Sequence, residues 1–366
     1  MINKIVTVLF PQDVTIEVSE FISQQGRRSF HVMFHVNPRS QNFEGQFTNL
    51  CEAFSRFQNQ FSSAEVKFAR LFLSDATNQM LTFNSHFSSL LHIPESQLSI
   101  IHQPPLDGSK VALWAHFVAD DCDEKLGIRH IWNMGMTCPE GSSYDQTKSV
   151  LETYESNLSH LGANIAENCV RTWFFVRDVD LQYQGLVDAR RENFIREGLT
   201  EKTHYISSTG ICGAPANTKA IVQLDTYTVL GLQKGQQRYL YAKSHLNPTY
   251  EYGVTFERGT AVQYPDRTEI FISGTASIDN KGNVVYPGDI QHQTERMLEN
   301  VRELLKEADA TFDDVMQIIV YLRDIADYQT VHDIFHDQFS QVPLIITYAP
   351  VCRPAWLIEM ECIAMK

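Results

Sequence analysis

The sequence lacks the short motifs that identify several large enzyme classes. It has no GxGxxG and no GxxxxGK[ST], the glycine-rich patterns whose backbone N–H groups bind phosphates. It also has no GxSxG nucleophile turn and no HExxH zinc motif. His332 and His336 lie one helical turn apart, but no third ligand accompanies them, so we interpret them as a solvated helix face. We therefore expect no metal and no other cofactor.

Basic charge is scarce as well. There are 30 Lys and Arg residues against 44 Asp and Glu residues, a net charge of −14, and no basic run. This balance argues against a nucleic-acid partner, and an anionic ligand would need a local basic pocket. The seven cysteines form no CxxC pair, and their odd number and scatter indicate reduced thiols and a cytoplasmic protein. The apolar run before Pro11 is too short for a signal peptide or a membrane span, so no membrane partner is expected.

What the sequence does contain is an internal repeat. With 366 residues and 43% hydrophobic content it is an ordinary globular chain of two or three domains. Two amphipathic helices are predicted, at 146–161 and 293–308, and each precedes an apolar strand that ends in an Arg-Asp pair. The pairs are Arg177-Asp178 and Arg323-Asp324, and each is followed by a tyrosine and a second helix. A fainter copy lies at the front, with Ser74-Asp75 in the place of Arg-Asp.

Each copy reads as a strand hairpin, a helix, a strand, a helix and two strands. This order predicts an α+β fold in which helices pack on one face of a mixed sheet. Polar linkers near 121–124 and 233–237 divide the chain into three predicted units, 1–122, 123–235 and 236–366. Chance similarity among amphipathic segments is the alternative, and it is a stronger objection for the first copy than for the other two.

The final strand carries the main candidate site. Side chains alternate along a strand, so Glu359 and Glu361 share one face and Ile358, Met360 and Cys362 share the other. Strands are depleted in glutamate, and a buried carboxylate needs a partner or a proton. Together with Arg353 on the preceding turn, this pattern suits binding an anion and delivering a proton to it. An exposed edge strand with solvated glutamates explains the same residues equally well, and so does a glutamate paired with a structural arginine.

The last unit resembles the RidA/YjgF family, once called translation initiation inhibitors. The matching residues are 270–276, Gly288-Asp289, Gln293-Thr294, Asn300, 320–324 and 358–364. Family members are homotrimers with sites between subunits, so the resemblance implies three tandem chorismate mutase-like units that form a pseudo-trimeric barrel from one chain. The family's imine deaminases use an arginine after the proline that precedes the penultimate strand. Here the proline is Pro343 and Ile345 takes the place of the arginine. A family tyrosine is also replaced near Ala261, and both departures argue against that activity.

A closer resemblance is to the chorismatases, a longer-chain branch of this family. It rests on 351–354 leading into 357–361, on 171–173, and on Tyr252-Gly253 with Phe256 and Arg258. The resemblance implies cleavage of the enolpyruvyl ether of chorismate to pyruvate and a dihydrodiol or a hydroxybenzoate. One departure is that chorismatases tend to carry Pro-Arg where this chain has Val254-Thr255.

The resemblance also implies roles for individual residues. Glu359 is the expected general acid, and Glu361 shares its proton or binds water. The expected substrate-binding residues are Arg353, Arg171, Arg258, Tyr348, Tyr252 and Gly274, with Cys352 beside Arg353 but without a histidine to make it a nucleophile. Three hypotheses stay open: a chorismatase-like enzyme acting on a small anionic metabolite, a RidA-like imine or enamine deaminase, and a non-catalytic small-molecule binder. The oligomeric state, a monomeric pseudo-trimer or a homo-oligomer, is open too.

Overall fold

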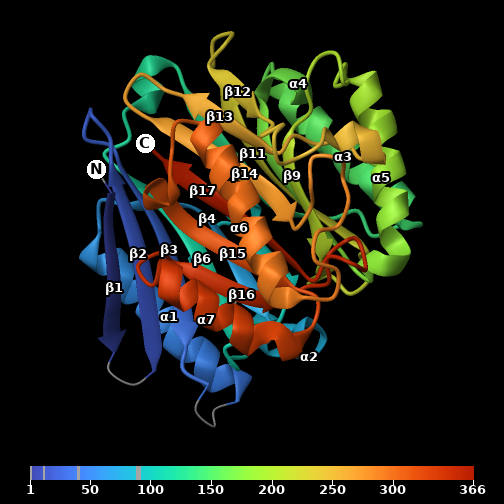
Figure 1. Cartoon of the computed structure of the whole chain (residues 1–366). Coiled ribbons are helices and arrows are strands. Elements are labelled where there is room, and N and C mark those ends of the chain that lie inside the picture. Colours follow the sequence, from blue (N-terminus) through green and yellow to red (C-terminus); the bar gives the residue numbers. More distant parts are fainter. Residues whose placement is uncertain (1, 11–12, 39–41, 88–91) are drawn as a thin grey trace.

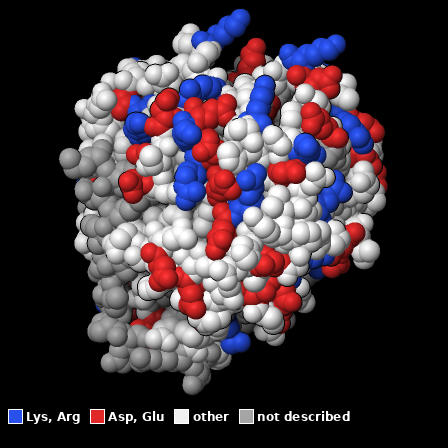
Figure 2. Space-filling view, viewed as in Figure 1, with Lys and Arg blue, Asp and Glu red and all other residues white. Residues whose placement is uncertain are grey.

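The computed structural model describes residues 2–10, 13–38, 42–87 and 92–366, with the side chains of 2–10, 86–87 and 252 excepted. Three mixed β-sheets form the interior, and the long helices lie on the outside (Figure 1). Within the described ranges, no helix is long and apolar enough to cross a membrane. Acidic and basic side chains are interspersed on the face shown in Figure 2, and that face has no broad basic patch.

The first sheet has the strand order β1-β2-β3-β6-β4-β5-β10 and is covered by α1. Its elements are β1 (Ile2–Phe10), β2 (Val14–Ile22), β3 (Arg28–Val36), α1 (Phe43–Gln60), β4 (Glu65–Leu73), α2 (Ala76–Thr82), β5 (Leu98–His102), β6 (Val111–Ala119) and the two-residue β10 (Ala214–Pro215). The phenylalanine stripe that predicted α1 is buried against this sheet, at Phe47, Phe54 and Phe57.

The second sheet has the order β7-β11-β8-β9, and α3 and α5 lie together beside it (Figure 1). Its elements are β7 (Arg129–Met136), α3 (Ser143–His160), α4 (Ile165–Asn168), β8 (Cys169–Val176), α5 (Val179–Arg196), β9 (Ser207–Cys212) and β11 (Val222–Leu230). Helix α3 begins with a capping box, in which Ser142 and Asp145 satisfy each other's backbone N–H groups.

The third sheet has the order β12-β13-β14-β17-β15-β16, with α6 packed on β14 and β17. Its elements are β12 (Gln237–Leu240), β13 (Gly259–Gln263), β14 (Thr268–Ala276), α6 (Ile290–Glu307), β15 (Val315–Leu322), α7 (Tyr328–Phe339), β16 (Leu344–Tyr348) and β17 (Ile358–Met365). Asp289 caps α6, whose predicted apolar stripe of Met297, Val301 and Leu304 is buried.

The three sheets repeat one strand pattern. In each, the last strand lies between the strand before the long helix and the strand after it, and the strand after the helix pairs in parallel with the next. The opening hairpin predicted for the second unit is the single strand β7. The registers agree as well, because the antiparallel pairs Leu73↔Val111, Val176↔Val222 and Leu322↔Ile358 occupy equivalent positions. The α+β class and the tandem mixed sheets are therefore confirmed.

The sheets are linked in a cyclic way. Ala214, two residues past β9, pairs with His102 of β5. Pro104, two residues past β5, accepts the N–H of Tyr348 at 2.9 Å, and Pro350, two residues past β16, accepts the N–H of Cys212 at 3.2 Å. Apart from such short contacts the three sheets stay separate hydrogen-bonded units among the described residues. The closed barrel expected from the sequence is thus wrong, because side-chain packing rather than a continuous strand ladder joins the sheets.

Candidate active site

The last strand, β17, places Glu359 and Glu361 on one face, as the alternation predicted. This strand lies between β14 and β15, and all of its residues are buried. The exposed-edge interpretation is therefore wrong. A buried carboxylate in this position must find hydrogen-bond donors or keep a proton. The two glutamates solve that problem in different ways.

Gly274 allows Glu359 to lie against the backbone of β14. A β-carbon on Gly274 would lie 2.0 Å from Oε1 of Glu359 and 2.8 Å from its Cδ. The glycine sits in a bulge of β14, between Ile272 and Thr275, and its N–H donates to the Thr209 hydroxyl at 3.0 Å. The close approach expected at Gly274 is thus an approach to the glutamate itself.

Glu359 is the buried acid with no recorded hydrogen bond to its carboxylate among the described residues. Its side chain belongs to a residue that is only 5% exposed. Burial is the largest cause that raises its pKa, and the neighbouring charge of Glu361 adds to it, while Arg171 and Arg258 oppose it. The result is a pKa of about 8, so Glu359 carries a proton at neutral pH.

Glu361 is surrounded by donors instead. Arg171 Nη2 donates to its Oε2 at 2.7 Å, and Trp173 Nε1 donates to its Oε1 at 2.8 Å. The Thr209 hydroxyl also donates to Oε2, and Arg70 Nη1 lies 3.8 Å from Oε1. These partners come from β8, β9 and β4, so Glu361 connects the third sheet to the other two.

A narrow cavity opens beside Glu359, with about 470 Å³ of empty space. The wall is built from α5 and β9 of the second sheet and from β14, β17 and nearby loops of the third. The lining residues are Tyr183, Arg190, Ser208, Gly210, Val254, Phe256, Arg258, Gly274, Ala276, Ile278, Cys352, Arg353, Trp356 and Glu359.

Three arginines give this cavity its charge. Arg190 and Arg258 are buried, and Arg353 is exposed. Arg190 Nη1 donates to Ser208 Oγ at 3.5 Å, and Arg258 Nη2 donates to the Asn247 carbonyl at 3.0 Å. Glu359 is the sole acidic side chain in the lining set, and it is protonated, so the cavity is locally cationic in an acidic molecule. Three guanidinium groups around one cavity suit a small molecule that carries two carboxylates, because each guanidinium can donate two hydrogen bonds to a carboxylate.

Five of the residues singled out from the sequence meet in this cavity: Gly274, Arg258, Cys352, Arg353 and Glu359. Burial, with the charge of Glu359 as the next cause, raises the pKa of Cys352 to about 12, so it is a thiol and not a thiolate nucleophile.

Two other predicted ligands do not reach the cavity. Arg171 lies outside the lining set, buried against Glu361. Tyr348 is 37% exposed at the end of β16, where its N–H binds Pro104, and it lines none of the wall. The side chain of Tyr252 lies outside the described residues.

The sequence reasoning missed Arg190, Tyr183 and Trp356. A signal for Arg190 existed, because it shares the buried stripe of α5 with Val187 and Phe194. A lone arginine on an apolar helical stripe is unusual, since charged side chains are seldom fully buried without a partner. Tyr183 packs over Gly210, where a β-carbon would lie 3.0 Å from its ring.

The equivalent positions in the other sheets carry no such acid. Counting from the matched pairs Val111, Val222 and Ile358, the place of Glu359 is taken by Ala112 in the first sheet and by Gln223 in the second. The place of Glu361 is taken by Trp114 and Asp225. At the position of Glu359, therefore, only the third of the three described sheets carries an acid.

The cleft between β16–α7 and β2–β3 is built differently. Its lining includes Ile345 and His332, and His35 lies between Glu17 at 3.3 Å and Asp107 at 3.4 Å. These two carboxylates overcome burial and raise the pKa of His35 to about 10. Glu17 also accepts the N–H of Leu344 at 2.9 Å, so the ion cluster ties the first sheet to the edge of the third.

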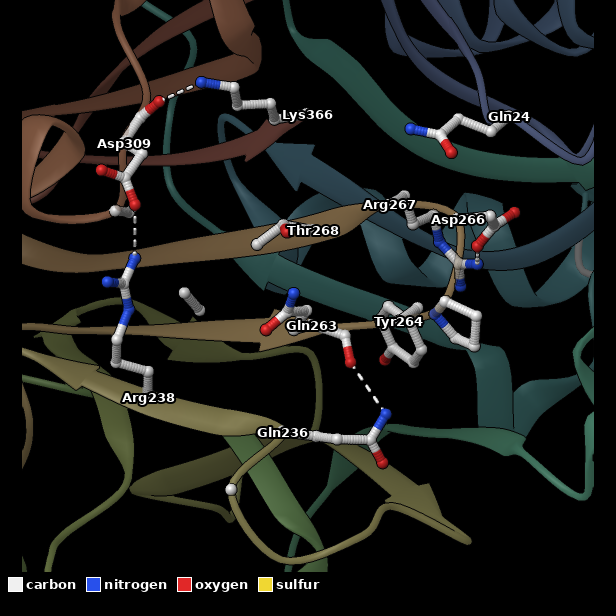
Figure 3. A pocket seen from close by; sticks show the side chains of 14 residues that line it. Gln24, Gln236, Arg238, Gln263, Tyr264, Asp266, Arg267, Thr268, Asp309 and Lys366 are labelled. Carbon is white, nitrogen blue, oxygen red and sulfur yellow. Dashed lines mark hydrogen bonds and ion pairs between the residues drawn. The ribbon is translucent and has the colours of Figure 1, made fainter.

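A larger hollow, with about 1040 Å³ of empty space, lies at the end of β12, β13 and β14 (Figure 3). Several of its polar side chains are already paired: Arg238 with Asp309 at 3.3 Å, and Gln236 with the Gln263 carbonyl at 2.8 Å. Its two acids, Asp266 and Asp309, are paired with Arg267 at 2.9 Å and with Arg238 at 3.3 Å, so size alone does not make it the better candidate. Within the described part of the chain, no cluster of three or more His, Cys, Asp or Glu residues could hold a metal ion.

Comparisons with known proteins agree with this architecture. The family model described as Endoribonuclease L-PSP matches residues 260–366. A RutC family protein of Pyrococcus abyssi is 35% identical over 99 residues, which are 26% of this chain and 78% of that protein. A 2-iminobutanoate/2-iminopropanoate deaminase of Bos taurus is 34% identical over 103 residues, 28% of this chain and 74% of that protein.

One solved structure extends the likeness beyond the last third. The crystal structure of a chorismatase superposes with a TM-score of 0.61, covering 82% of this chain and 92% of that one. Sequence identity in this alignment is 16%, so the likeness is one of fold.

Proposed function

We propose, from the premise that this chain belongs to the RutC (RidA/YjgF) family, that its Glu359 cavity cleaves the enolpyruvyl ether of chorismate or a close relative and releases pyruvate. The single observation that carries this proposal is a buried, protonated Glu359, with a pKa of about 8, in a cavity with three arginines. A neutral carboxyl at this pH is a competent general acid, and the arginines supply sites for carboxylates.

The chemistry follows from the proton on Glu359. The acid transfers it to the terminal methylene carbon of the enolpyruvyl group, which becomes a methyl group and leaves an oxocarbenium-like centre. Water adds to that centre, and the carbon–oxygen bond to the ring oxygen breaks, giving pyruvate and a dihydrodiol. Attack by a ring hydroxyl leads instead to pyruvate and a hydroxybenzoate. The Glu359 carboxylate that remains is reprotonated from water.

The arginines would hold the two carboxylates of the substrate. Arg190 and Arg258 lie in the buried part of the cavity and Arg353 at its exposed side, so one substrate carboxylate is bound deep and the other near the mouth. The apolar wall of Tyr183, Phe256 and Trp356 would face the ring. Arg190 thus joins Arg353 and Arg258 as a proposed substrate ligand.

We also propose that the chain is a pseudo-trimer of units 1–122, 123–235 and 236–366, with one live cleft. The repeated strand order and the cyclic contacts after β5, β9 and β16 support the three units. The cleft between the second and third units keeps the acid, and Ala112 and Gln223 stand in its place elsewhere.

The imine-deaminase alternative draws support from the sequence relatives of that name. The position expected to carry the family arginine is Ile345, which lines the other cleft, and its equivalent beside Glu359 is Thr209. Neither is basic, so the cavity favours ether cleavage. A non-catalytic binder remains the third candidate, and it predicts binding of the same dianion without turnover.

The experiment that tests the proposal is a coupled pyruvate-release assay with purified protein and chorismate, beside an assay with 2-iminobutanoate. Chromatography of the aromatic co-product separates the dihydrodiol from a hydroxybenzoate. Pyruvate release supports the proposal. Ammonia release from the imine alone, or binding of unchanged chorismate, would replace it with one of the two alternatives.

A further inference from the structure

We propose that Glu361 is a positioning residue: its charged carboxylate, fixed by Arg171, Trp173 and Thr209 from another sheet, adds to burial in keeping the proton on Glu359. This inference rests on the proposed function, and it reverses the expectation that the two glutamates share one proton. Its basis is the set of hydrogen-bond donors around Glu361 and the set of charges that face Glu359.

The donors leave no place for a proton on Glu361. Oε2 accepts from Arg171 and from the Thr209 hydroxyl, and Oε1 accepts from Trp173. The Thr209 oxygen already receives the N–H of Gly274 and a second contact from Arg171. A proton on Glu361 would therefore face donors on every side, and a carboxylate satisfies all of them.

The remaining charged groups around Glu359 are cations. They are Arg171 from β8, Arg190 from α5, Arg258 before β13 and Arg353 on the turn before β17. The other titratable groups near it are Cys352, Tyr183 and Tyr321, and the pKa values of Cys352 and Tyr321 are raised, so both are neutral. Four cations alone would favour an ionised Glu359. Glu361 is the one anion in this set, about 7 Å along the same strand face.

A purely structural role must be distinguished from this one. In the second sheet, the equivalent Asp225 is buried against Arg70 at 2.9 Å and accepts the N–H of Gly135 at 2.7 Å, but it stands beside Gln223 rather than an acid. A carboxylate at this position therefore also joins two sheets. Loss of stability alone cannot test the proposal, so the readout has to be the proton on Glu359.

The test is a pH titration of Glu359 by NMR of protein labelled with ¹³C at the glutamate carboxyl, with Glu359→Gln identifying the signal. In Glu361→Gln, we expect the midpoint of Glu359 to fall by about one pH unit or more, because an anion is removed and Arg171 is left unneutralised. Arg171→Gln removes a cation, so the midpoint should rise. Trp173→Phe keeps both charges and should shift the midpoint far less than either.

The Glu359 midpoint is interpreted separately in each variant that folds. Thermal unfolding and circular dichroism show which variants are folded. An unchanged Glu359 midpoint in folded Glu361→Gln, or a fall in Arg171→Gln, would overturn the proposal. The titration needs no substrate, so it is separate from the proposed reaction. If the midpoints shift as predicted but no pyruvate is released, the proposed reaction is rejected and the role of Glu361 stands. If pyruvate is released but the midpoints do not shift, the reaction stands and the role of Glu361 is rejected.

Discussion

The carboxyl group of Glu359 occupies the space that a side chain on Gly274 would fill, since Oε1 lies 2.0 Å from the site of a β-carbon. This relationship explains how the carboxyl group of Glu359 on β17 can lie directly against the backbone of β14. It also means that the protonation of Glu359 depends on a backbone feature of a neighbouring strand.

Gly274→Ala should therefore displace the acid. We expect pyruvate release to fall by about 10²-fold or more, with a loss of stability of about 1–3 kcal/mol from overpacking. Gly162→Ala is the matched control, because Gly162 has a φ of +70° and nothing within 4 Å of its β-carbon site. It should cost about 1 kcal/mol of stability through strain and leave the turnover number unchanged. Equal losses of activity in both variants would contradict the contact argument.

The free energy of unfolding should depend on pH as expected for a buried acid that is neutral in the folded state. The pKa of Glu359 is raised to about 8, so between about pH 4.5 and pH 8 the folded state binds more protons than the unfolded state. The free energy of unfolding of the wild type, relative to Glu359→Gln, should thus fall as pH rises through that window, by at most about 1.4 kcal/mol per pH unit. Urea titrations at several pH values measure this difference. A difference that stays constant from about pH 5 to pH 8 would mean that Glu359 is ionised in the folded protein.

Arg190 should matter for substrate binding more than for stability of α5. Arg190→Met removes a buried cation from the cavity, and we expect KM for chorismate to rise by about 10- to 100-fold, the loss of a charge-assisted hydrogen bond of about 1.5–3 kcal/mol. Arg196→Met is the control on the same helix, where Arg196 makes exposed ion pairs with Glu155 and Glu197. Its KM should stay within about two-fold of the wild type. Steady-state kinetics would contradict the assignment if the two variants behaved alike.

His35 should stabilise the contact between the first and third sheets in a pH-dependent way. Its pKa is raised to about 10 by Glu17 and Asp107, so its contribution is complete below about pH 6.5 and is lost as pH rises through about 10. The stability difference between wild type and His35→Gln should shrink over that interval. His332→Gln, on the opposite wall, is the control for a histidine-to-glutamine substitution in the same chemical denaturation series. A difference that is constant from pH 6 to about pH 10 would show that the imidazolium does not stabilise the contact.

Much of this architecture could be predicted from the chain. The repeated helix and strand patterns predicted most of the order of elements, because a buried face imposes its period on local sequence. The exception is the second unit, which opens with the single strand β7 and not with a hairpin. Period-2 alternation also placed Glu359 and Glu361 on one face of β17. Whether that face was buried depended on which strands flank it, and a single strand's sequence carries no information on its neighbours.

The contacts that the sequence did not reveal are those between distant segments. Arg171 was expected to bind substrate, yet it pairs with Glu361, 190 positions away in the chain. Arg190 was missed because the sequence of α5 does not show which residues face the third sheet, and only the packing of the two turns Arg190 toward the cavity. The expected closed barrel failed for the same reason, since the strand order within a unit says little about how three sheets meet.

The most direct test of the account is the initial rate of pyruvate release from chorismate, measured from about pH 6 to pH 9.5 for the wild type, Glu359→Gln and the control Glu295→Gln on the surface of α6. The account predicts release by the wild type and the control, a rate that declines above about pH 8, and a loss of about 10²-fold or more in Glu359→Gln. No pyruvate from folded wild-type protein, or equal rates with and without the Glu359 carboxyl, would contradict it.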